Sequence, residues 1–368
     1  IAHHFNCPVI AMSTIGVTSW SLELTGTPAP MSFVPNGLLS FKDKMNLKER
    51  LINILFSLYD KLFSLYLQEK IYNREIPNPK PPLQELRRSK VSLVLLNNHF
   101  SLSVPRPYLP NMIEVGGMQI NLNPDPLSPE LENFIKSAKH GVIFFSMGGN
   151  LWPSRMTNEI KQSILNSLSK IKQKVIWKWD ETLDVDQNKF LIKKWLPQDS
   201  ILAHPNVKLF LTHGGWLSVT ESVHHGVPMI GIPIFGDQMA NMNSVATNGF
   251  GVRLDYQNLT EISLDWALNE LLGNIKYKEN IAKASRIYRD QPMKPIETAK
   301  FWVEYVIRHK GAPHFKSAAT QLTTIELYNI DAYLILFMVV LMVVLVLTFI
   351  VQNLIKLIIH KSDKVKTS

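Results

Sequence analysis

The chain has 368 residues, of which 46% are hydrophobic and 19% are charged, a composition typical of a folded protein and not of a disordered one. Its formal net charge is +9, but we find no basic helix, zinc-ligand spacing or aromatic RNA-binding motif, which argues against nucleic acid as a partner. The single cysteine, Cys7, excludes a disulfide within the chain and a zinc site built from cysteines. The length allows two domains of ordinary size.

The first part of the chain has a mixed pattern. Residues 8–12 and 91–97 each predict a strand, and residues 26–37, with their glycines and prolines, predict a loop. Residues 41–71 predict a helix, with leucines among charged residues at Leu51, Leu55, Leu58, Leu62 and Leu65. We expect this leucine stripe to pack in the core; contact with a membrane is the alternative.

From Gly116 onward, predicted strands and helices alternate. Strands are expected at 142–146, 174–179, 207–211 and 229–232, with helices between them, and this alternation implies a parallel, doubly wound sheet. Residues 264–289 predict a largely helical stretch that Pro292 and Pro295 end. A further helix is expected at 301–309.

The C-terminal region predicts a membrane span. Leu334–Val351 is an apolar run of 18 residues, interrupted only by Thr348, which would extend about 27 Å as a helix, close to the thickness of a bilayer's hydrocarbon core. A buried helix of a soluble core is the alternative. Acidic residues precede the run and lysines follow it, so the short tail is expected in the cytosol.

Two short signals bear on the compartment. Lys364 and Lys366 stand fifth and third from the end, as in a dilysine signal for return to the endoplasmic reticulum, although a random basic tail would look the same. Asn258, in Asn258-Leu259-Thr260, is a candidate glycosylation site. We therefore expect a single-pass protein of the endoplasmic reticulum membrane with its globular part in the lumen. No signal peptide is recognised at the start, so we expect a longer parent protein.

The most informative segment runs from Trp195 to Gln238. A strand there is followed by Thr212-His213-Gly214-Gly215 and then by a helix, which would present free backbone N–H groups and the positive end of the helix dipole to an anion. The two glycines would let the backbone approach a pyrophosphate closely. His213, at the carboxyl end of the strand, could donate to a phosphate oxygen.

The remaining polar residues of this segment suit other parts of a nucleotide sugar. Ser218, in the first turn of the helix, could add a hydroxyl donor, and Glu221 could accept both hydroxyls of a ribose. Asp237 and Gln238, which are expected to start the next helix, could hydrogen-bond several hydroxyls of the sugar.

This constellation resembles the signature of the UDP-glycosyltransferase family, in the membrane-bound animal branch of UDP-glucuronosyl- and UDP-glucosyltransferases, and it is most similar to the insect members. The likeness continues at 106–117, 141–148 and 290–311, so it covers nearly the whole chain, although the chain covers only part of the family's length. A plain Rossmann-like turn with incidental polar residues is the alternative. The positions that match the family's spacing are Trp195, Gln198, His213, Gly214, Gly215, Ser218, Glu221, Pro228, Pro233, Asp237 and Gln238.

The resemblance implies an α/β fold of GT-B type, with two Rossmann-like domains, the N-terminal one partial, and one C-terminal transmembrane helix. It implies the following division: a partial N-terminal acceptor-binding domain at 1–115, a donor-binding domain at 116–290, a crossover helix and linker at 291–330, a transmembrane helix at 331–352 and a basic tail at 353–368.

The resemblance also implies the reaction, which is the inverting, metal-independent transfer of a hexose from a UDP-sugar to a small lipophilic acceptor, in detoxification. The UDP-sugar is a co-substrate, and no cofactor is expected. Trp195 would stack on the uracil, with Gln198 bonded to the uridine; an ordinary core tryptophan is the alternative. The expected donor-site residues are Ser146, Gly148, Trp195, Gln198, Thr212, His213, Gly215, Ser218, Glu221, Asp237 and Gln238.

Two features of the sequence limit this chemistry. The family's catalytic His and its Asp partner are expected upstream of this chain, and His3 and His4 stand in the wrong context to replace them, so the chain alone is expected to hold a donor site and no base. Asp184-Val185-Asp186 could hold a metal in a different glycosyltransferase fold, but we expect it in a solvated loop.

Departures from the family point to the donor sugar. Vertebrate glucuronosyltransferases carry Asn where this chain has Leu217, and they carry an Arg that we align with Leu96. A guanidinium would pair with the carboxylate of glucuronic acid and leucine cannot, so we expect UDP-glucose as donor.

Two other functions stay open. The chain could be a truncated, non-catalytic isoform that binds UDP-sugar or pairs with intact relatives. An NAD-dependent oxidoreductase is a weaker alternative, because no G-x-G-x-x-G turn is present. The acceptor cannot be named, and a homo- or hetero-oligomer is left open.

Overall fold

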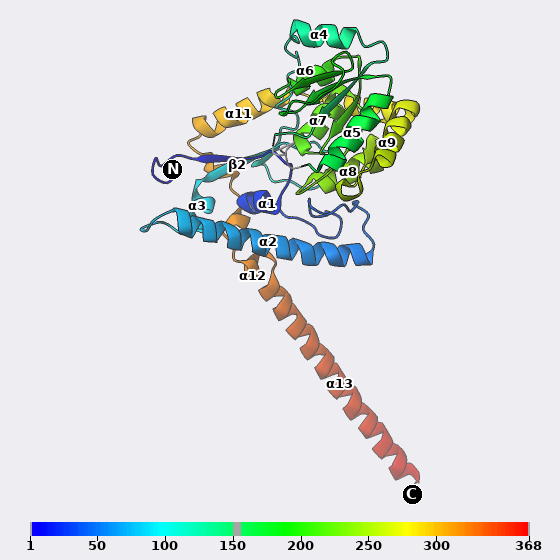
Figure 1. The fold of residues 1–368 in the computed structure, drawn as a ribbon. Helices are drawn as coiled ribbons and strands as arrows, with labels where there is room; N and C mark the ends of the chain where they lie inside the picture. Colours follow the sequence, from blue (N-terminus) through cyan, green and yellow to red (C-terminus); the bar gives the residue numbers. More distant parts are fainter. Residues whose placement is uncertain (1, 150–155, 367–368) are drawn as a thin grey trace. The chain divides into compact units, whose positions relative to one another are not determined.

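The computed structural model describes residues 2–149 and 156–366, with side chains described as far as residue 356 (Figure 1). The chain divides into two units, Ile1–Lys316 and Ser317–Ser368. The first unit contains two parallel β-sheets with their helices, and the second is helical.

The larger sheet has six parallel strands in the order β6-β5-β4-β7-β8-β9. This confirms the predicted parallel, doubly wound sheet, and the four predicted strands agree with the structure to within one residue. The strands β6 and β9 were not predicted, because runs of three or four residues are too short to show a period. The bounds are β4 (Val142–Ser146), β5 (Lys174–Lys178), β6 (Phe190–Lys193), β7 (Val207–Thr212), β8 (Met229–Gly231) and β9 (Gly251–Arg253).

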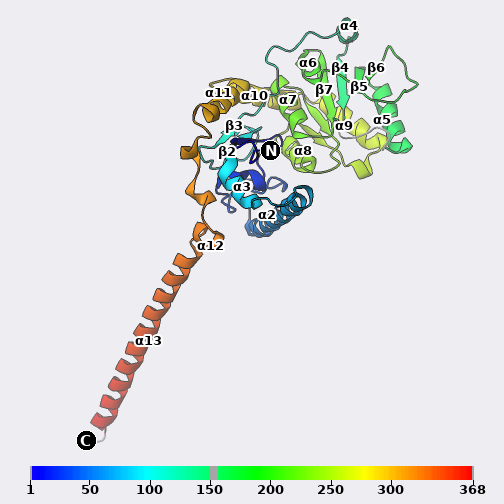
Figure 2. The same ribbon diagram turned by 90° about the vertical axis from the view of Figure 1, so that its left-hand side faces the viewer.

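Alternate side chains of the central strands enter two separate cores, because helices cover both faces of this sheet (Figures 1 and 2). Val142 and Phe144 pack with α4, α6, α7, α8 and α10, whereas Ile143 and Phe145 pack with α5 and α9. Burial on both faces explains why these strands read as continuous apolar runs. The helix bounds are α4 (Pro129–Lys136), α5 (Asn158–Lys170), α6 (Gln198–Ala203), α7 (Trp216–His225), α8 (Gln238–Thr247), α9 (Glu261–Gly273) and α10 (Ile275–Arg289).

One helix prediction is confirmed and one needs correction. The stretch 264–289 is largely helical, as predicted: it contains most of α9 and all of α10. Asn274 separates the two helices, and its side chain accepts a hydrogen bond from the backbone N–H of Lys276 and so caps α10. The helix expected at 301–309 is α11 (Pro295–Arg308), which begins six residues earlier. Proline is well suited to the first position of a helix, because a backbone N–H at that position would have no hydrogen-bond partner within the helix. Pro295 therefore starts a helix here.

The smaller sheet has three parallel strands in the order β1 (Val9–Ser13), β2 (Val91–Leu96) and β3 (Met112–Glu114). The helix α11 packs on it, with Ala299 and Val306 against Leu93 and Leu95. The short helices α1 (Ser19–Thr25) and α3 (Leu83–Lys90) and the strand β3 were not predicted from the sequence.

The long helix of the first unit is α2 (Leu47–Glu75), which lies at the edge of the unit in Figures 1 and 2. It begins later than predicted because Asn46 forms a capping box with Glu49. Every exposed residue from position 51 to position 67 is aliphatic or aromatic, and we call these residues the outer stripe of α2. They are Leu51, Ile52, Ile54, Leu55, Leu58, Tyr59, Leu62, Phe63, Tyr66 and Leu67.

The prediction that the leucine stripe of this helix packs in the core is therefore wrong. Leu55 is 69% exposed and Leu62 is 67% exposed, whereas Asn53 is fully buried on the opposite side. The amide of Asn53 donates to the backbone oxygens of Met31 and Val34, both at 2.9 Å, so polar contacts hold the helix to the unit.

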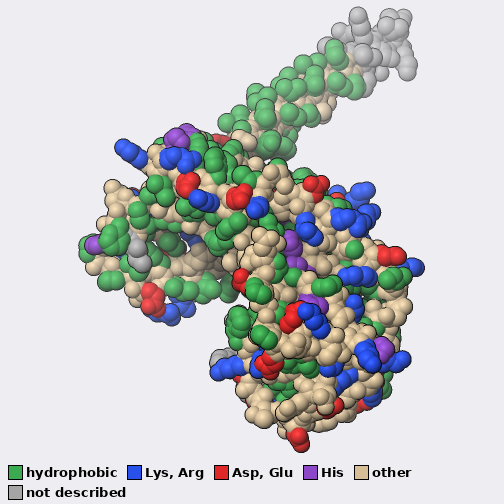
Figure 3. Space-filling view, turned by 90° about the horizontal axis from the view of Figure 1, so that it is seen from above, with side chains coloured by type: hydrophobic (Ala, Val, Ile, Leu, Met, Phe, Trp, Pro, Cys, Tyr) green, Lys and Arg blue, Asp and Glu red, His purple; other side chains and the backbone are tan. Residues whose placement is uncertain are grey.

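The second unit contains α12 (Thr324–Leu327) and α13 (Ile330–Lys366). Within α13, Ile330–Lys356 is long and apolar enough to cross a membrane; its most apolar 18 residues have a mean hydropathy of 3.4 and none of them is buried, which argues against the alternative of a core helix. Figure 3 shows apolar side chains covering this helix. The candidate retrieval signal, Lys364 and Lys366, lies in its last turns, and those side chains fall outside the described part.

The close packing of β9 on β8 provides a test of the fold. A Cβ atom on Gly251 would lie 1.9 Å from the backbone oxygen of Met229, whereas one on Gly273, at the end of α9, would meet nothing. We expect Gly251→Ala to lower the free energy of unfolding by about 3 kcal/mol, because backbone must move. Gly273→Ala should raise it by about 0.5 kcal/mol. Denaturant unfolding of the chain in detergent compares the two, and equal midpoints would contradict this packing.

Candidate functional site

The strand order of the larger sheet places a topological switch point between β4 and β7. The chain leaves β4 toward one edge of the sheet and later returns beside it as β7 before moving to the other edge. Such a switch point, at the carboxyl ends of the strands, is where open α/β sheets bind ligands. The predicted site residues Ser146 and Thr212 end these two strands and are paired in register.

The two strand ends are built alike. The hydroxyl of Ser146 accepts a hydrogen bond from the backbone N–H of Gly148, and that of Thr212 accepts one from Gly214, both at 3.3 Å. Both glycines have positive φ, +76° and +82°, which turns the chain at each strand end. Ser146 and Thr212 are buried, so in this structure they shape the loops around the switch point.

The imidazole of His213 lies between two glycines. A Cβ on Gly148 would come within 2.7 Å of its Cε1, and a Cβ on Gly215 within 2.7 Å of its Nε2. Any larger residue at either position would therefore push the ring away. Gly148, taken from the likeness at 141–148, therefore packs directly against His213, and Gly215, taken from the spacing of the 195–238 segment, does the same.

Burial keeps this imidazole neutral. It lowers the pKa of His213 to about 4, with Asp237 acting to raise the pKa and Lys178 to lower it. A neutral ring has one N–H to donate, and the Thr212 hydroxyl lies 3.4 Å from Nδ1. The ring therefore suits hydrogen bonding to an anion at neutral pH and is unsuited to supplying a proton.

Sequence reasoning missed one cation beside this ring. The ammonium of Lys178, in the last position of β5, donates to the backbone oxygen of Gly148 at 3.2 Å. Its position at the carboxyl end of a predicted strand was the available signal. It places a positive charge next to the loop that was expected to face a diphosphate.

The first turn of α7 has no side-chain cap. Its N-cap is Gly215, which provides no side-chain cap, whereas Thr157 caps α5 with its hydroxyl. The indole of Trp216 donates to the backbone oxygen of Asn97 at 2.6 Å and so fixes the start of α7 against the smaller sheet. Uncapped N–H groups and the helix dipole together favour an anion at this place.

Three of the predicted residues form a hydrogen-bonded cluster along α7. The amide of Gln198 donates to the Ser218 hydroxyl at 3.1 Å and to the Glu221 carboxylate at 2.7 Å. Burial raises the pKa of Glu221 to about 7, the Gln198 hydrogen bond acts to lower it, and Asp199 acts to raise it. Glu221 is therefore balanced between its neutral and charged forms near neutral pH.

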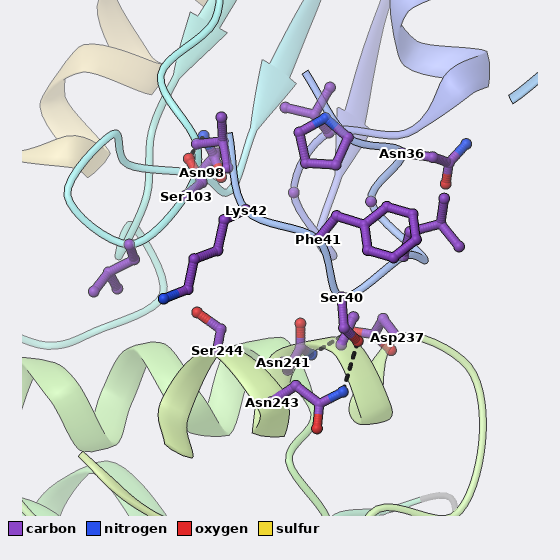
Figure 4. Close-up of a pocket in the computed structure, with 18 of the residues that line it drawn as sticks. Asn36, Ser40, Phe41, Lys42, Asn98, Ser103, Asp237, Asn241, Asn243 and Ser244 are labelled. Atoms are coloured by element: carbon purple, nitrogen blue, oxygen red, sulfur yellow. Dashed lines mark hydrogen bonds between the residues drawn. The ribbon is translucent and has the colours of Figure 1, made fainter. Parts of the chain in front are cut away.

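The start of α8 forms the wall opposite the smaller sheet. A cavity of about 470 Å³ lies between α8 and residues 35–43 and 98–106. The carboxylate of Asp237 accepts a hydrogen bond from the amide of Asn241 at 2.7 Å, and the same amide donates to the backbone oxygen of Gly214 at 2.9 Å. Figure 4 shows side chains facing one another across this cavity: Ser40 and Lys42 on one side, Asp237, Asn241, Asn243 and Ser244 on the other.

Gln238 is placed differently from what the sequence suggested. It is only 4% exposed, and its side-chain oxygen accepts hydrogen bonds from the backbone N–H groups of Ile234 and Phe235, at 2.8 and 3.1 Å. That oxygen therefore holds the loop before α8. Binding of a sugar by Gln238 stays a prediction and would have to use its NH2 group.

Trp195 is 72% exposed, so the alternative of a core tryptophan is wrong, and stacking on uracil stays a prediction.

Asp184 and Asp186 are exposed in the loop between β5 and β6, and the carboxylate of Asp186 accepts from the backbone N–H of Asn188. Among the described residues, no cluster of three metal-ligating side chains occurs. Asn258 is exposed at the end of a 3-10 turn.

In this structure, position 96 does not support the inference about the donor sugar. Leu96 is fully buried in the core of the smaller sheet, so an arginine at this position would not reach a ligand. The residue at the carboxyl end of β2 is Asn97, whose side-chain oxygen accepts from the backbone N–H of Gly117 at 3.1 Å. The other position, Leu217, is 41% exposed in the first turn of α7.

Comparison with known proteins agrees with this geometry. A family described as "UDP-glucoronosyl and UDP-glucosyl transferase" matches residues 1–365. "UDP-glycosyltransferase UGT5" of Dactylopius coccus is 39% identical and is matched over 90% of this chain and 64% of its own length. "UDP-glucosyltransferase 2" of the same organism is 34% identical over 98% of this chain and 71% of its own length. "UDP-glucuronosyltransferase 1A10" of Homo sapiens is 38% identical over 90% and 62%. The chain thus spans about two thirds of the length of these relatives.

Solved structures with the same fold are glycosyltransferases. The glycotransferase of kitacinnamycin superposes with a TM-score of 0.53 at 17% identity, over 82% of this chain and 71% of that one. CalG4, the calicheamicin glycosyltransferase, superposes with a TM-score of 0.52 at 17% identity, over 83% and 70%. The predicted α/β fold of GT-B type is confirmed by this likeness.

Proposed function

Because this chain belongs to the UDP-glucuronosyl and UDP-glucosyl transferase family, we propose that it provides the donor site of an enzyme that transfers a hexose from a UDP-sugar to a small lipophilic acceptor. The observation that carries the proposal is the imidazole of His213, packed between Gly148 and Gly215 beside the uncapped start of α7. These groups form an anion site at the switch point of the sheet.

Each part of the nucleotide sugar has a proposed partner. The diphosphate lies on the backbone N–H groups of α7 and on His213, with Lys178 nearby. The ribose hydroxyls donate to Glu221, the uracil stacks on Trp195, and the hexose lies toward Asp237 and the cavity beside α8.

The proposed reaction is a displacement with inversion at the anomeric carbon. The acceptor oxygen forms a bond to this carbon and loses its proton to a general base, while the bond to the diphosphate breaks and UDP leaves with the electron pair. Donors fixed at the place where negative charge develops stabilise the leaving UDP in the transition state. His213 and the α7 N-terminus supply such donors.

Anchoring in a membrane is part of the same proposal. Ile330–Lys356 has the length and hydropathy of a span, and Asp331 stands at its start. We assign the globular unit to the lumen of the endoplasmic reticulum and the lysine-bearing tail to the cytosol, on the asymmetry of charge around the span.

The proposed donor is UDP-glucose. The strand end at Asn97 carries no positive charge, and Asp237 would repel the carboxylate of a glucuronate at the proposed hexose position, an effect that Lys42 across the cavity would oppose. At a separation of about 4 Å in water, one like charge costs about 1 kcal/mol, which is roughly a fivefold loss of affinity.

Calorimetric titration of the chain with each donor tests this preference without requiring the catalytic base. We expect UDP-glucose to bind about fivefold more tightly than UDP-glucuronate. Asp237→Asn is the matched variant, because it keeps the size of the side chain and removes its charge, and it should reduce the difference. Equal or tighter binding of UDP-glucuronate to the unmodified chain would refute the donor assignment.

A further inference from the structure

The helix α2 is attached to its unit by its polar side. Asn53 is fully buried and bonded to the backbone of residues 31–36. About two turns further on the same side, the carboxylate of Asp60 accepts hydrogen bonds from the amide of Asn36 at 3.0 Å and from the hydroxyl of Ser19. Water-facing helices of globular proteins have the reverse arrangement, with the apolar side inward.

The outer stripe of α2 is therefore an extended apolar surface. Its ten residues lie on about four and a half turns of one helix and include no charged group. Soluble proteins rarely expose a continuous apolar patch of this extent unless something binds to it. Burying one leucine or phenylalanine side chain contributes about 1.5–3 kcal/mol of favourable free energy. Binding of a partner that covers the outer stripe would therefore be strongly favourable.

The chemistry of the outer stripe fits a lipid surface. Tyr59 and Tyr66 combine an apolar ring with a hydroxyl, the combination that is enriched where hydrocarbon meets headgroups. Charged residues of both signs stand at the two ends of the helix: Lys48, Glu49 and Arg50 at the start, and Glu69, Lys70, Arg74 and Glu75 at the end. An interfacial helix has this composition, with aliphatic and aromatic residues on one side and lysine or arginine at its polar boundary.

The connection to the proposed span keeps the unit near a bilayer. The ammonium of Lys316, the last residue of the first unit, donates to the backbone oxygens of Arg88 and Ser89 in α3, at 3.1 and 2.5 Å. The hydroxyl of Tyr72, near the end of α2, donates to the backbone oxygen of Pro81 just before α3. The chain thus leaves the unit close to α2, and the 14 residues from there to Ile330 reach at most about 50 Å.

The structure assigns the outer stripe of α2 to the surface of the bilayer that α13 crosses, with the helix lying among the headgroups. This assignment rests on the proposed membrane anchoring. The charge-free stripe requires no anionic lipid, so a zwitterionic bilayer is the expected partner.

The test uses the full chain in vesicles of phosphatidylcholine. Cys7 is the only cysteine and is exposed, so Cys7→Ser gives a background for single labels. An environment-sensitive nitrobenzoxadiazole label is placed at Leu62→Cys, or at Leu55→Cys if the first variant does not fold. Control labels are at Ile262→Cys, an 83% exposed position of α9, and at Leu341→Cys in the proposed span. Two sets of vesicles contain lipids with a nitroxide either near the headgroup, which quenches a label at the interface, or deep on an acyl chain, which quenches a label inside the bilayer such as that at Leu341.

We expect quenching of about twofold at Leu62, with a blue-shifted emission, and little change at Ile262, since an interfacial helix buries its apolar side about 5–10 Å deep. Quenching at Leu62 no greater than at Ile262 would overturn the assignment of the outer stripe. If the label at Leu341 is quenched in the same experiment, the proposed membrane anchoring by α13 is still supported. A blue-shifted but unquenched label at Leu62 would also overturn it, because a protein surface or a second copy would then cover the stripe. An unquenched label at Leu341 would refute the anchoring itself.

Discussion

Replacing His213 with alanine is expected to weaken the binding of UDP to this chain by about ten- to a hundredfold. A hydrogen bond to a charged group contributes about 1.5–3 kcal/mol, and the ring is held in place by Gly148 and Gly215 before the ligand arrives. Because burial lowers the pKa of His213 to about 4, its contribution to UDP affinity should not change between about pH 6 and about pH 8. Calorimetric titration with UDP measures the loss.

Two further variants separate the role of the ring from a general loss of structure. His140→Ala removes an exposed histidine and should leave the affinity unchanged. Gly215→Ala keeps the imidazole but places a methyl group 2.7 Å from its Nε2, so it should also weaken UDP binding. If His213→Ala binds UDP as tightly as His140→Ala, the anion site is not where we place it.

The carboxyl group of Glu221 is expected to make the stability of the nucleotide-free chain fall as pH rises. Its pKa is raised by burial from 4.5 to about 7, so the folded chain holds a proton that the unfolded chain has released in this interval. The contribution of this group to the free energy of unfolding is fully present below pH 4.5 and is lost as pH rises to about 7. The loss is about 3 kcal/mol at 1.36 kcal/mol per pKa unit.

Glu221→Gln isolates this contribution, because glutamine has nearly the same shape and does not ionise. The difference in free energy of unfolding between the two chains, measured by denaturant at a series of pH values, should change across the interval from 4.5 to about 7. If ribose hydroxyls donate to the ionised carboxylate, UDP binding should also release a proton from the unmodified chain. A difference that stays flat with pH would contradict the buried position of Glu221.

The central strands could be predicted from the sequence because each is a short, continuous apolar run. Burial on both faces removes polar residues from such strands. For residues 142–146, the predicted strand and β4 have the same first and last residues. The shorter strands at Phe190–Lys193 and Gly251–Arg253 carry too few residues for such a pattern. They are strands because a neighbouring strand pairs with them, which local sequence does not show.

The candidate site was predictable in part. His213 and Gly215 were predicted from the spacing of the 195–238 segment and Gly148 from the likeness at 141–148, and the structure packs both glycines against the His213 ring. The side-chain oxygen of Gln238 is held by a backbone N–H 4 residues away, and the ammonium of Lys178 bonds to a backbone oxygen 30 residues away. Such contacts could not be predicted from the sequence. Spacing alone gives residue types and not the direction in which a side chain points.

The helix α2 shows the same limit most clearly. Its leucines recur at helical spacing, and this pattern predicts a stripe but does not say which side of the helix is covered. The polar residues Asn53 and Asp60 find partners within the unit, so the leucines face outward. Only tertiary contacts decide between a core helix and a surface helix.

A crystal structure of the chain with UDP bound tests the central claim most directly. We expect the diphosphate at the first turn of α7 within hydrogen-bonding distance of His213, the ribose at Glu221 and the uracil against Trp195. Density for the diphosphate at another strand end, or an unoccupied switch point between β4 and β7 at saturating UDP, would contradict the assignment.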